Sequence, residues 1–267
     1  MLITETKLRS IIRSVLAEGI YDPGILKAVF MAGGPGSGKS YTAKVIFGGD
    51  PKSVMNVSTS SGLKIVNSDP AFEKFLHDAG IDPADLGKMS DEEFKAVTVG
   101  PDSPRGKAKK IKQASQAAWT REDAKLGVII DGTGDDFGKI QKRKAALEDL
   151  GYDTYMVFVN TSLEVAQERN ANRDRKLPAD LVEEIWSDVQ QNLGGFQKLF
   201  GANNIAIVDN TVYGPLPEDV GKAVNAFVKA PVKNPIGRKW IEGELNQRGG
   251  GTKKERGKLL GQGRRRR

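Results

Sequence analysis

The stretch that most limits how this chain can fold is a glycine-rich segment, residues 33–40, which reads Gly-Gly-Pro-Gly-Ser-Gly-Lys-Ser. It fits the pattern G-x-x-x-x-G-K-[ST], with Gly33, Gly38, Lys39 and Ser40 in the fixed positions. Glycine has no Cβ atom, so the backbone N–H groups of such a loop can close around phosphate oxygens. An apolar run precedes the loop and a helical pattern follows it. The sequence therefore predicts a strand–loop–helix unit that binds the phosphates of a nucleotide.

The residue types in this loop predict how ATP and Mg²⁺ would be held. Lys39 is expected to reach the β- and γ-phosphates, and the Ser40 hydroxyl is expected to ligate Mg²⁺. The helix predicted to follow the loop would present its positive end to the same anion. The predicted ATP-binding residues are Gly33, Gly34, Gly36, Ser37, Gly38, Lys39, Ser40, Tyr41 and Arg169. The alternative, a glycine-rich turn without a ligand, has no use for Lys39.

Apolar runs and helical patterns alternate through most of the chain. Short runs rich in Val and Ile occur at 26–32, 63–67, 127–131, 154–160 and 204–209. Helical patterns occur at about 41–47, 70–79, 104–125, 137–150, 162–174, 178–200 and 217–229. This alternation predicts an α/β protein with three layers, in which helices cover both faces of a five-stranded parallel sheet.

An aspartate follows the second apolar run, in Val-Asn-Ser-Asp-Pro at 66–70. Strand carboxyl ends face the ligand crevice of an open α/β sheet, so Asp69 is predicted to be the general base for an attacking hydroxyl. A purely structural alternative remains open. An aspartate before a proline is also a common helix start, with Pro70 as the first helical residue.

A second aspartate ends the third run, in Asp-Gly-Thr at 131–133. Asp131 is predicted to be a metal residue that, with Ser40, helps to hold Mg²⁺. Gly132 and Thr133 would then approach substrate or phosphate. The alternative is a simple strand-end turn, because Asp-Gly is a turn dipeptide.

Three arginines lie in the segment Ser162–Pro178. Arg169 and Arg173 are four residues apart and share one helix face. Arg173 and Arg175 lie where the helix breaks before Pro178. Guanidinium groups on a lid can neutralise charge on a transferring phosphoryl group, so Arg173 and Arg175 join Lys39 and Asp69 as predicted catalytic residues. The alternative is a solvated basic face.

Together these pieces resemble the zeta-toxin-like and polynucleotide-kinase-like P-loop kinases, many of them encoded by phages. The matching parts, within about residues 26–210, are GGPGSGKS, the strand ending VNSD, the strand VIIDGT, and S-x-E-x-A-x-x-R-N-x-x-R-x-R-x-L-P before an acidic helix. The resemblance implies an ATP-dependent phosphotransferase, a five-stranded parallel sheet, Asp69 as base, Arg173 or Arg175 in the lid, and a phage origin.

The sequence departs from that pattern in the acceptor region. Those families usually follow the aspartate with an aromatic residue and an arginine that help to hold the substrate. Here Phe72 is followed by Glu73. About sixty residues separate Asp69 from Asp131, and a basic run lies between them. Its members, Arg105, Lys107, Lys109, Lys110 and Lys112, would contact a polyanionic acceptor or form a solvated helix face.

Positive charge is concentrated at the C-terminal end. The net charge is +7, yet residues 231–267 carry twelve Lys or Arg and three Glu, and the remaining 230 residues have a net charge of −2. We expect residues 1–20 to contain an amphipathic helix (4–18) that packs on the body or docks a partner, 21–230 to form the kinase domain, and 231–267 to be a flexible, disordered basic tail. The tail would bind nucleic acid nonspecifically or serve as a tether.

Composition excludes several classes of site. With no cysteine and a single histidine, His77, the chain has no disulfide, cysteine-based metal site or histidine cluster. No apolar run approaches the roughly 18 residues needed to span a membrane, and we expect a cytoplasmic protein, in the host cytoplasm if phage-encoded.

Two functions follow from these patterns. The first is transfer of the γ-phosphate of ATP to a hydroxyl acceptor, which would be a nucleotide, a nucleotide sugar, a nucleic-acid 5′-hydroxyl or a protein. The second is a P-loop ATPase, or a nucleotide-binding structural component of a nucleoprotein or virion assembly that is anchored by its basic tail.

Overall fold

In a computed structural model, the chain is described at residues 20–22, 24–48, 61–173, 176–212, 214–215 and 217–261. The amphipathic helix predicted over 4–18 lies outside these residues.

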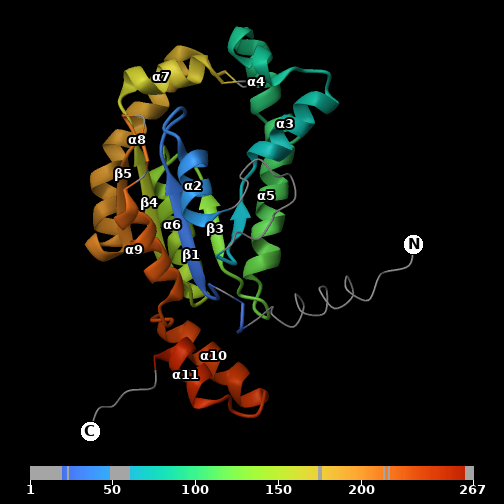
Figure 1. The fold of residues 1–267 in the computed structure, drawn as a ribbon. Coiled ribbons are helices and arrows are strands. Elements are labelled where there is room, and N and C mark those ends of the chain that lie inside the picture. The colour runs from blue at the N-terminus through green and yellow to red at the C-terminus, as the bar shows by residue number, and fades with distance from the viewer. Residues whose placement is uncertain are drawn as a thin grey trace, which may run out of the picture.

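The described part of the chain contains a parallel sheet of five strands in the order β2-β3-β1-β4-β5 (Figure 1). The strands are β1 (Lys27–Ala32), β2 (Lys64–Val66), β3 (Val128–Asp131), β4 (Asp153–Asn160) and β5 (Ile205–Asp209). Each lies within one of the five apolar runs or extends it by one residue. The predicted five-stranded parallel sheet is confirmed.

Helices cover both faces of the sheet and extend beyond it at both ends (Figure 1). They are α2 (Lys39–Phe47), α3 (Asp69–Asp78), α4 (Asp91–Thr98), α5 (Pro104–Thr120), α6 (Phe137–Asp149), α7 (Leu163–Ala171), α8 (Ala179–Phe200), α9 (Glu218–Lys229), α10 (Pro235–Gln247) and α11 (Lys253–Leu260). Short 3-10 helices are η1 (Pro83–Lys88) and η2 (Ala202–Asn204). The sequence analysis predicted α2, α3 and α5–α9, and it missed α4, α10 and α11.

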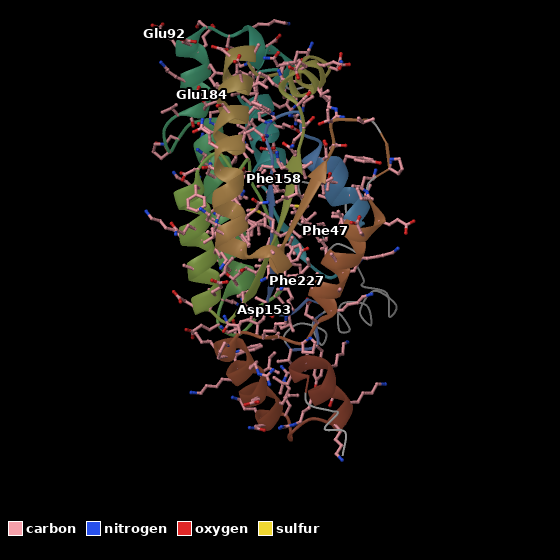
Figure 2. All side chains as sticks on the ribbon, turned by 90° about the vertical axis from the view of Figure 1, so that its left-hand side faces the viewer. Phe47, Glu92, Asp153, Phe158, Glu184 and Phe227 are labelled. Atoms are coloured by element: carbon pink, nitrogen blue, oxygen red, sulfur yellow. The ribbon has the colours of Figure 1, made fainter. Side chains whose placement is uncertain are left out.

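Alternate residues of the strands build two separate cores. Phe30 of β1 and Phe158 of β4 face a core completed by α6 and α8, whereas Val29 and Val157 face a core completed by α2 and α9. Figure 2 shows Phe158 in the middle of the body, between the helices and the sheet. All six residues of β1 are buried, which explains why this central strand reads as a continuous apolar run.

A third apolar cluster holds together the segment between β2 and β3. Phe72 and Leu76 of α3 pack there with Leu86 of η1, Val97 of α4 and Ala108 of α5. In Figure 1 these helices stand beside the sheet and rise above its carboxyl edge. The sixty residues between Asp69 and Asp131 therefore form one wall beside the P-loop.

The prediction of a disordered tail is wrong for residues 231–261. These residues form α10 and α11, and Ile241, Leu245 and Leu260 join the same core as the strands. The sequence contains the signals for both helices. Asn234 caps α10 before Pro235, and Thr252 with Glu255 forms a capping box at α11. The high charge and glycine content of this segment led to the prediction of disorder, although a few apolar residues are spaced so that they pack against the core.

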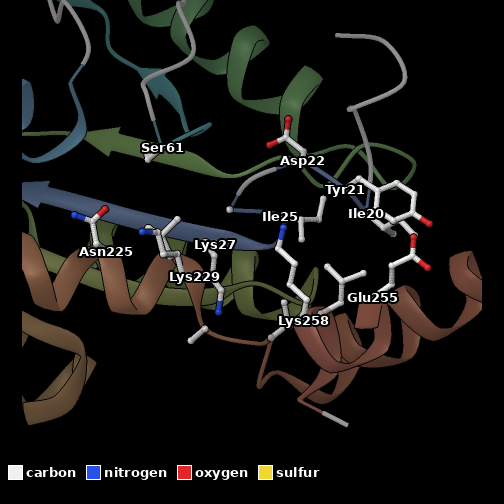
Figure 3. Close-up of a pocket in the computed structure, with 15 residues that line it drawn as sticks. Ile20, Tyr21, Asp22, Ile25, Lys27, Ser61, Asn225, Lys229, Glu255 and Lys258 are labelled. Carbon is white, nitrogen blue, oxygen red and sulfur yellow. The ribbon is translucent and has the colours of Figure 1, made fainter. Parts of the chain in front are cut away.

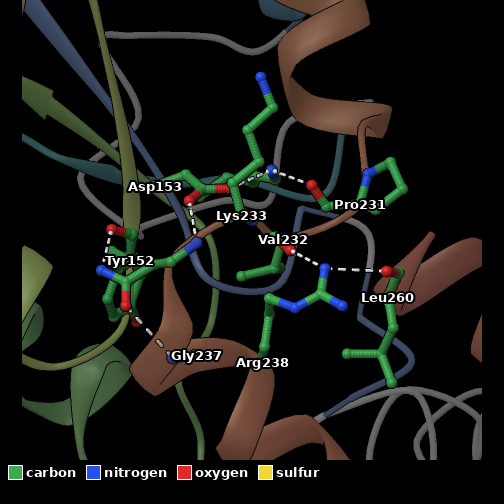
Figure 4. A network of polar contacts seen from close by, with 10 residues as sticks. Tyr152, Asp153, Pro231, Val232, Lys233, Gly237, Arg238 and Leu260 are labelled. Carbon is green, nitrogen blue, oxygen red and sulfur yellow. Dashed lines mark hydrogen bonds and ion pairs between the residues drawn. The ribbon is translucent and has the colours of Figure 1, made fainter. Parts of the chain in front are cut away.

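A buried polar network joins these C-terminal helices to the sheet (Figure 4). The Lys27 Nζ atom lies 2.7 Å from an Asp153 carboxylate oxygen, and that carboxylate also accepts hydrogen bonds from the backbone N–H groups of Lys233 and Asn234, at 2.9 and 2.8 Å. Arg238 donates to the main-chain oxygen of Leu260 at 2.9 Å. Figure 2 shows Asp153 at the end of the body that meets α10 and α11.

Candidate active site

The P-loop joins β1 to α2, and its glycines are required by its shape. Gly36 and Gly38 have φ angles of +74° and +86°, in the left-handed region that favours glycine. A Cβ atom at Gly36 would lie 2.3 Å from the main-chain oxygen of Ala166 in α7, so the loop packs directly on that helix. The Asn210 side chain steadies the loop from the end of β5 by donating to the main-chain oxygen of Ser37 at 2.7 Å.

Lys39 lies at the first position of α2 and points back over the loop. Its Nζ atom donates to the main-chain oxygen of Gly33 and, at 3.2 Å, to that of Gly34. Burial lowers the pKa of Lys39, while the nearby charges of Asp131 and Asp69 partly offset that effect. The ammonium group therefore lies within the site at the point where a bound phosphate is expected.

One cavity of about 460 Å³ brings together most of the predicted site residues. The predicted residues that line it are Gly34, Gly36, Gly38, Lys39, Ser40, Asp69, Asp131, Arg169 and Arg173. Gly33 and Ser37 are buried behind the loop surface, and the Tyr41 side chain is 49% exposed on α2 and does not line the cavity. Arg175 lies outside the described residues.

Asp69 occupies the first position of α3, and Ser68 occupies the cap position before it. The Asp69 carboxylate accepts a hydrogen bond from Arg105 of α5 at 2.7 Å, and the Arg105 guanidinium lies 5.0 Å from the centre of the Phe72 ring. An arginine from another helix thus lies beside both Asp69 and Phe72. The carboxylate faces the P-loop cavity, where a base is expected.

Asp131 ends β3 beside Lys39, and one of its oxygens is unusual. Its Oδ1 atom is buried and has no hydrogen-bond partner among the described residues. Burial raises the pKa of this carboxyl, and the charges of Lys39 and Lys112 partly offset the rise. Lys112 of α5 donates to the main-chain oxygen of Asp131, and burial lowers the pKa of Lys112 to about 8.

Asp131 and Ser40 line the same cavity, and their carboxylate and hydroxyl groups offer oxygen ligands of the kind that Mg²⁺ prefers. The side chains present therefore fit the ion that the P-loop implies. Within the described ranges, no group of three or more His, Cys, Asp or Glu side chains is arranged to hold a metal ion.

Two of the predicted arginines reach the cavity from α7 and the residues after it. The Arg169 Nη1 atom lies 3.5 Å from the main-chain oxygen of Gly36, and Arg173 lines the cavity two residues beyond the helix end. The Asn170 side chain ties this turn to Leu177 by hydrogen bonds of 2.8 and 3.1 Å to its main-chain O and N atoms. Arg169 on α7 and Arg173 just after it therefore lie beside the P-loop.

Sequence reasoning missed how the basic run is divided between two faces of α5. Arg105, Lys109 and Lys112 line the site, whereas Lys107 does not and Lys110 pairs with Asp102 at 3.4 Å. The spacing i, i+4, i+7 within the run was the available signal. Lys139 and Arg143 of α6 also reach this region, and no local pattern connects them to it.

A larger cavity, of about 520 Å³, lies at the opposite end of β1, next to α11 (Figure 3). Lys27, Lys229 and Lys258 line it, and Figure 3 shows them approaching from three separate segments. It contains none of the P-loop residues. The candidate active site is therefore at the carboxyl ends of the strands, where open α/β sheets bind ligands.

No protein-family model and no curated protein sequence matches this chain. Among solved structures, the AvrRxo1-ORF1:AvrRxo1-ORF2 crystal structure with sulphate ions is similar at a TM-score of 0.51 and 11% identity, over 78% of this chain and 64% of that chain. The chain thus spans less than two thirds of that protein's length.

A structure of the PezAT toxin–antitoxin system of Streptococcus pneumoniae is similar at a TM-score of 0.47 and 13% identity, over 92% of this chain and 99% of that chain. At these identities the comparisons show the fold alone. The fold that the resemblance implied, with its five-stranded parallel sheet, is confirmed, and the AvrRxo1-ORF1:AvrRxo1-ORF2 structure is similar to it.

Along the described residues, no helix is both long enough and apolar enough to cross a membrane.

Proposed function

We propose that this chain is an ATP-dependent phosphotransferase that moves the γ-phosphate of ATP to a hydroxyl acceptor: a nucleotide, a nucleotide sugar or a nucleic-acid 5′-hydroxyl. The observation that supports it best is the placement of Asp69. Its carboxylate and the Lys39 ammonium line one cavity, so a base and a phosphate-binding cation meet in the same space. A P-loop that only binds ATP does not need a base beside the γ-phosphate.

The loop residues would hold the nucleotide. Backbone N–H groups from Gly34 to Tyr41 would surround the β-phosphate, and the Tyr41 N–H belongs to the first turn of α2, where helix N–H groups have no partner within the helix. Lys39 would exchange its main-chain oxygen partners for phosphate oxygens. Arg169 and Arg173 would neutralise charge on the γ-phosphate, and Arg175 is proposed to act with them.

Ser40 and Asp131 would hold Mg²⁺. The ion neutralises negative charge on the phosphates when it is bound. The buried, unpartnered Asp131 oxygen supports this assignment, because an orphaned carboxylate oxygen beside a phosphate site is costly unless a ligand completes it.

The reaction balances with the groups present. The acceptor oxygen forms a bond to the γ-phosphorus, and the bond from that phosphorus to the bridging oxygen breaks, so ADP leaves. The acceptor proton passes to Asp69. Arg105 holds the Asp69 carboxylate toward the cavity, and Lys39 with Arg173 stabilises the charge on the transferring group.

The test is a transfer assay with γ-labelled ATP and Mg²⁺ against nucleosides, nucleotides, UDP-sugars and 5′-hydroxyl oligonucleotides. We expect label on one acceptor class, and we expect Asp69→Asn to lower the turnover rate by about 10²–10⁴-fold with little change in ATP affinity. Lys39→Ala should weaken ATP binding as well.

The control is Asp78→Asn, at the exposed end of the same helix, which should leave transfer unchanged. Release of free phosphate without any labelled acceptor, at the same rate in Asp69→Asn, would contradict the kinase. It would favour the ATPase or assembly component instead.

The location and partners are separate parts of the proposal. We propose a cytoplasmic protein whose helix at 4–18 docks a protein partner. We also propose that 231–267 bind nucleic acid without sequence preference. The support is the exposure of cations on α10 and α11, which include Lys239, Lys253 and Lys254.

A further inference from the structure

A second, smaller cavity of about 180 Å³ opens beside the P-loop cavity, between α5, α6 and the ends of β2 and β3. The two cavities share Lys39, Asp69 and Asp131 among their lining residues, so they are adjacent and Asp69 lies between them. Lys112, Lys139 and Arg143 line only the smaller one.

The smaller cavity contains more positive than negative charge. Six cationic side chains line it, Lys39, Arg105, Lys109, Lys112, Lys139 and Arg143, against two carboxylates, Asp69 and Asp131. Arg105 is paired with Asp69. Lys109, Lys139 and Arg143 form no ion pair with any carboxylate in the described ranges.

This arrangement is electrostatically unfavourable without a ligand. Burial lowers the pKa of Arg143, and burial together with the neighbouring charges of Arg105 and Lys139 lowers the pKa of Lys109. Arg143 is partly buried, whereas Lys109 and Lys139 are exposed. The repulsion among these like charges around one cavity is unfavourable, and a bound anion would offset it. A guanidinium beside several ammonium groups is well suited to a phosphate, which offers several oxygens to charged donors.

We propose that this cavity is a subsite for a phosphate group that the acceptor already carries, so that the acceptor is a phosphorylated hydroxyl compound. The inference rests on the proposed function, because Asp69 must be the base for the acceptor hydroxyl. A phosphate held by Lys139 and Arg143 would fix the molecule on the β2–β3 side of Asp69. Its hydroxyl would then face the P-loop from the side opposite the nucleotide.

The first experiment measures binding without chemistry. The full chain is saturated with Mg²⁺ and the non-hydrolysable analogue adenosine 5′-(β,γ-imido)triphosphate, which fills the P-loop, and inorganic phosphate is then titrated in a calorimeter. We expect phosphate to bind, and we expect Arg143→Gln and Lys139→Gln each to weaken it at least tenfold. Lys107→Gln, on the exposed face of α5, should leave the affinity unchanged. Because Arg143 is partly buried, Arg143→Lys and the melting temperature of each variant separate loss of the site from loss of the fold.

The second experiment presents acceptors in matched pairs, such as a nucleoside with its monophosphate and a sugar with its 1-phosphate. Only the phosphorylated member should accept label, and Arg143→Gln should raise its KM at least tenfold while the KM for ATP stays the same. Equal use of the neutral members would overturn the inference, as would phosphate binding that is absent or unchanged in both variants.

The two hypotheses fail in different ways. If the ATP analogue binds and labelled phosphate is transferred to neutral acceptors, the subsite is wrong and the kinase stands. If inorganic phosphate binds through Arg143 but neither the phosphorylated nor the neutral acceptors receive label, the cavity is an anion site, and both the kinase and the acceptor assignment are wrong.

Discussion

Single residues decide whether the P-loop can take the shape that phosphate binding requires. Gly36 has a left-handed φ angle and packs closely against Ala166. Glycine is therefore required both for the backbone conformation and for the absence of a Cβ atom. Gly221, in the interior of α9, has open space where a Cβ atom would lie. The two glycines form a matched pair for the same substitution.

Gly36→Ala is expected to weaken ATP binding at least tenfold and to destabilise the fold, because a Cβ atom would collide with the Ala166 oxygen. Gly221→Ala should instead stabilise the protein by about 0.5–1 kcal/mol, because alanine is the better helix former. Nucleotide titration and urea unfolding of both variants measure these effects. Full ATP affinity in Gly36→Ala would mean that the loop can be displaced from α7 without loss of function.

Residue-scale contacts are also where sequence reasoning reached its limit. The P-loop, Asp69 and Asp131 were predicted because each belongs to a local pattern at the end of a strand. The pairing of Asp69 with Arg105 was not predicted, because it joins residues 36 positions apart whose meeting depends on how α3 and α5 pack. The position of Arg143 beside the site was not predicted for the same reason.

Among the helices and strands too, some could be predicted from local sequence and others could not. The strands were predicted well because the central strands of a parallel sheet are buried on both faces and read as continuous apolar runs. α10 and α11 were missed because their apolar residues are few and separated by charges and glycines. Their stability depends on a surface built by distant strands, which composition does not reveal.

The packing of α10 against the sheet depends on Asp153. Asp153→Asn should cost about 3–5 kcal/mol, because Lys27, only 2% exposed, would lose its counter-ion. Lys27→Met should cost less, since Asp153 keeps two backbone N–H donors. The double variant should recover part of the loss, which a double-mutant cycle from urea unfolding would show. A double variant whose cost equals the sum of the two single costs would mean that the pair does not interact.

At the scale of the whole molecule, the two proposed activities lie at opposite ends of the sheet (Figure 1). The candidate active site is at the carboxyl ends of the strands, and α10 and the basic helix α11 are at their amino ends. Nothing in this arrangement requires one site to be filled for the other to work.

Replacing Lys239, Lys253 and Lys254 with glutamine should therefore weaken duplex DNA binding and flatten its salt dependence, by roughly one unit of slope for each DNA phosphate that is no longer neutralised. Phosphate transfer should be unaffected. Lys95→Gln, an exposed lysine of α4, serves as the control for general charge effects. An unchanged salt slope in the triple variant would exclude α10 and α11 as a nucleic-acid surface.

The position of β1 at the centre of the sheet also has a consequence for biosynthesis. Its first residue, Lys27, bonds Asp153 across a sequence separation of 126 residues and the main chain of Pro231 across 204. At about 5–20 residues per second, the ribosome needs roughly 6–25 seconds to deliver β4 after β1 has been made. During that interval β1, whose six residues are all buried in the folded protein, has an unsatisfied edge, so the nascent chain should depend on chaperones until its later strands emerge.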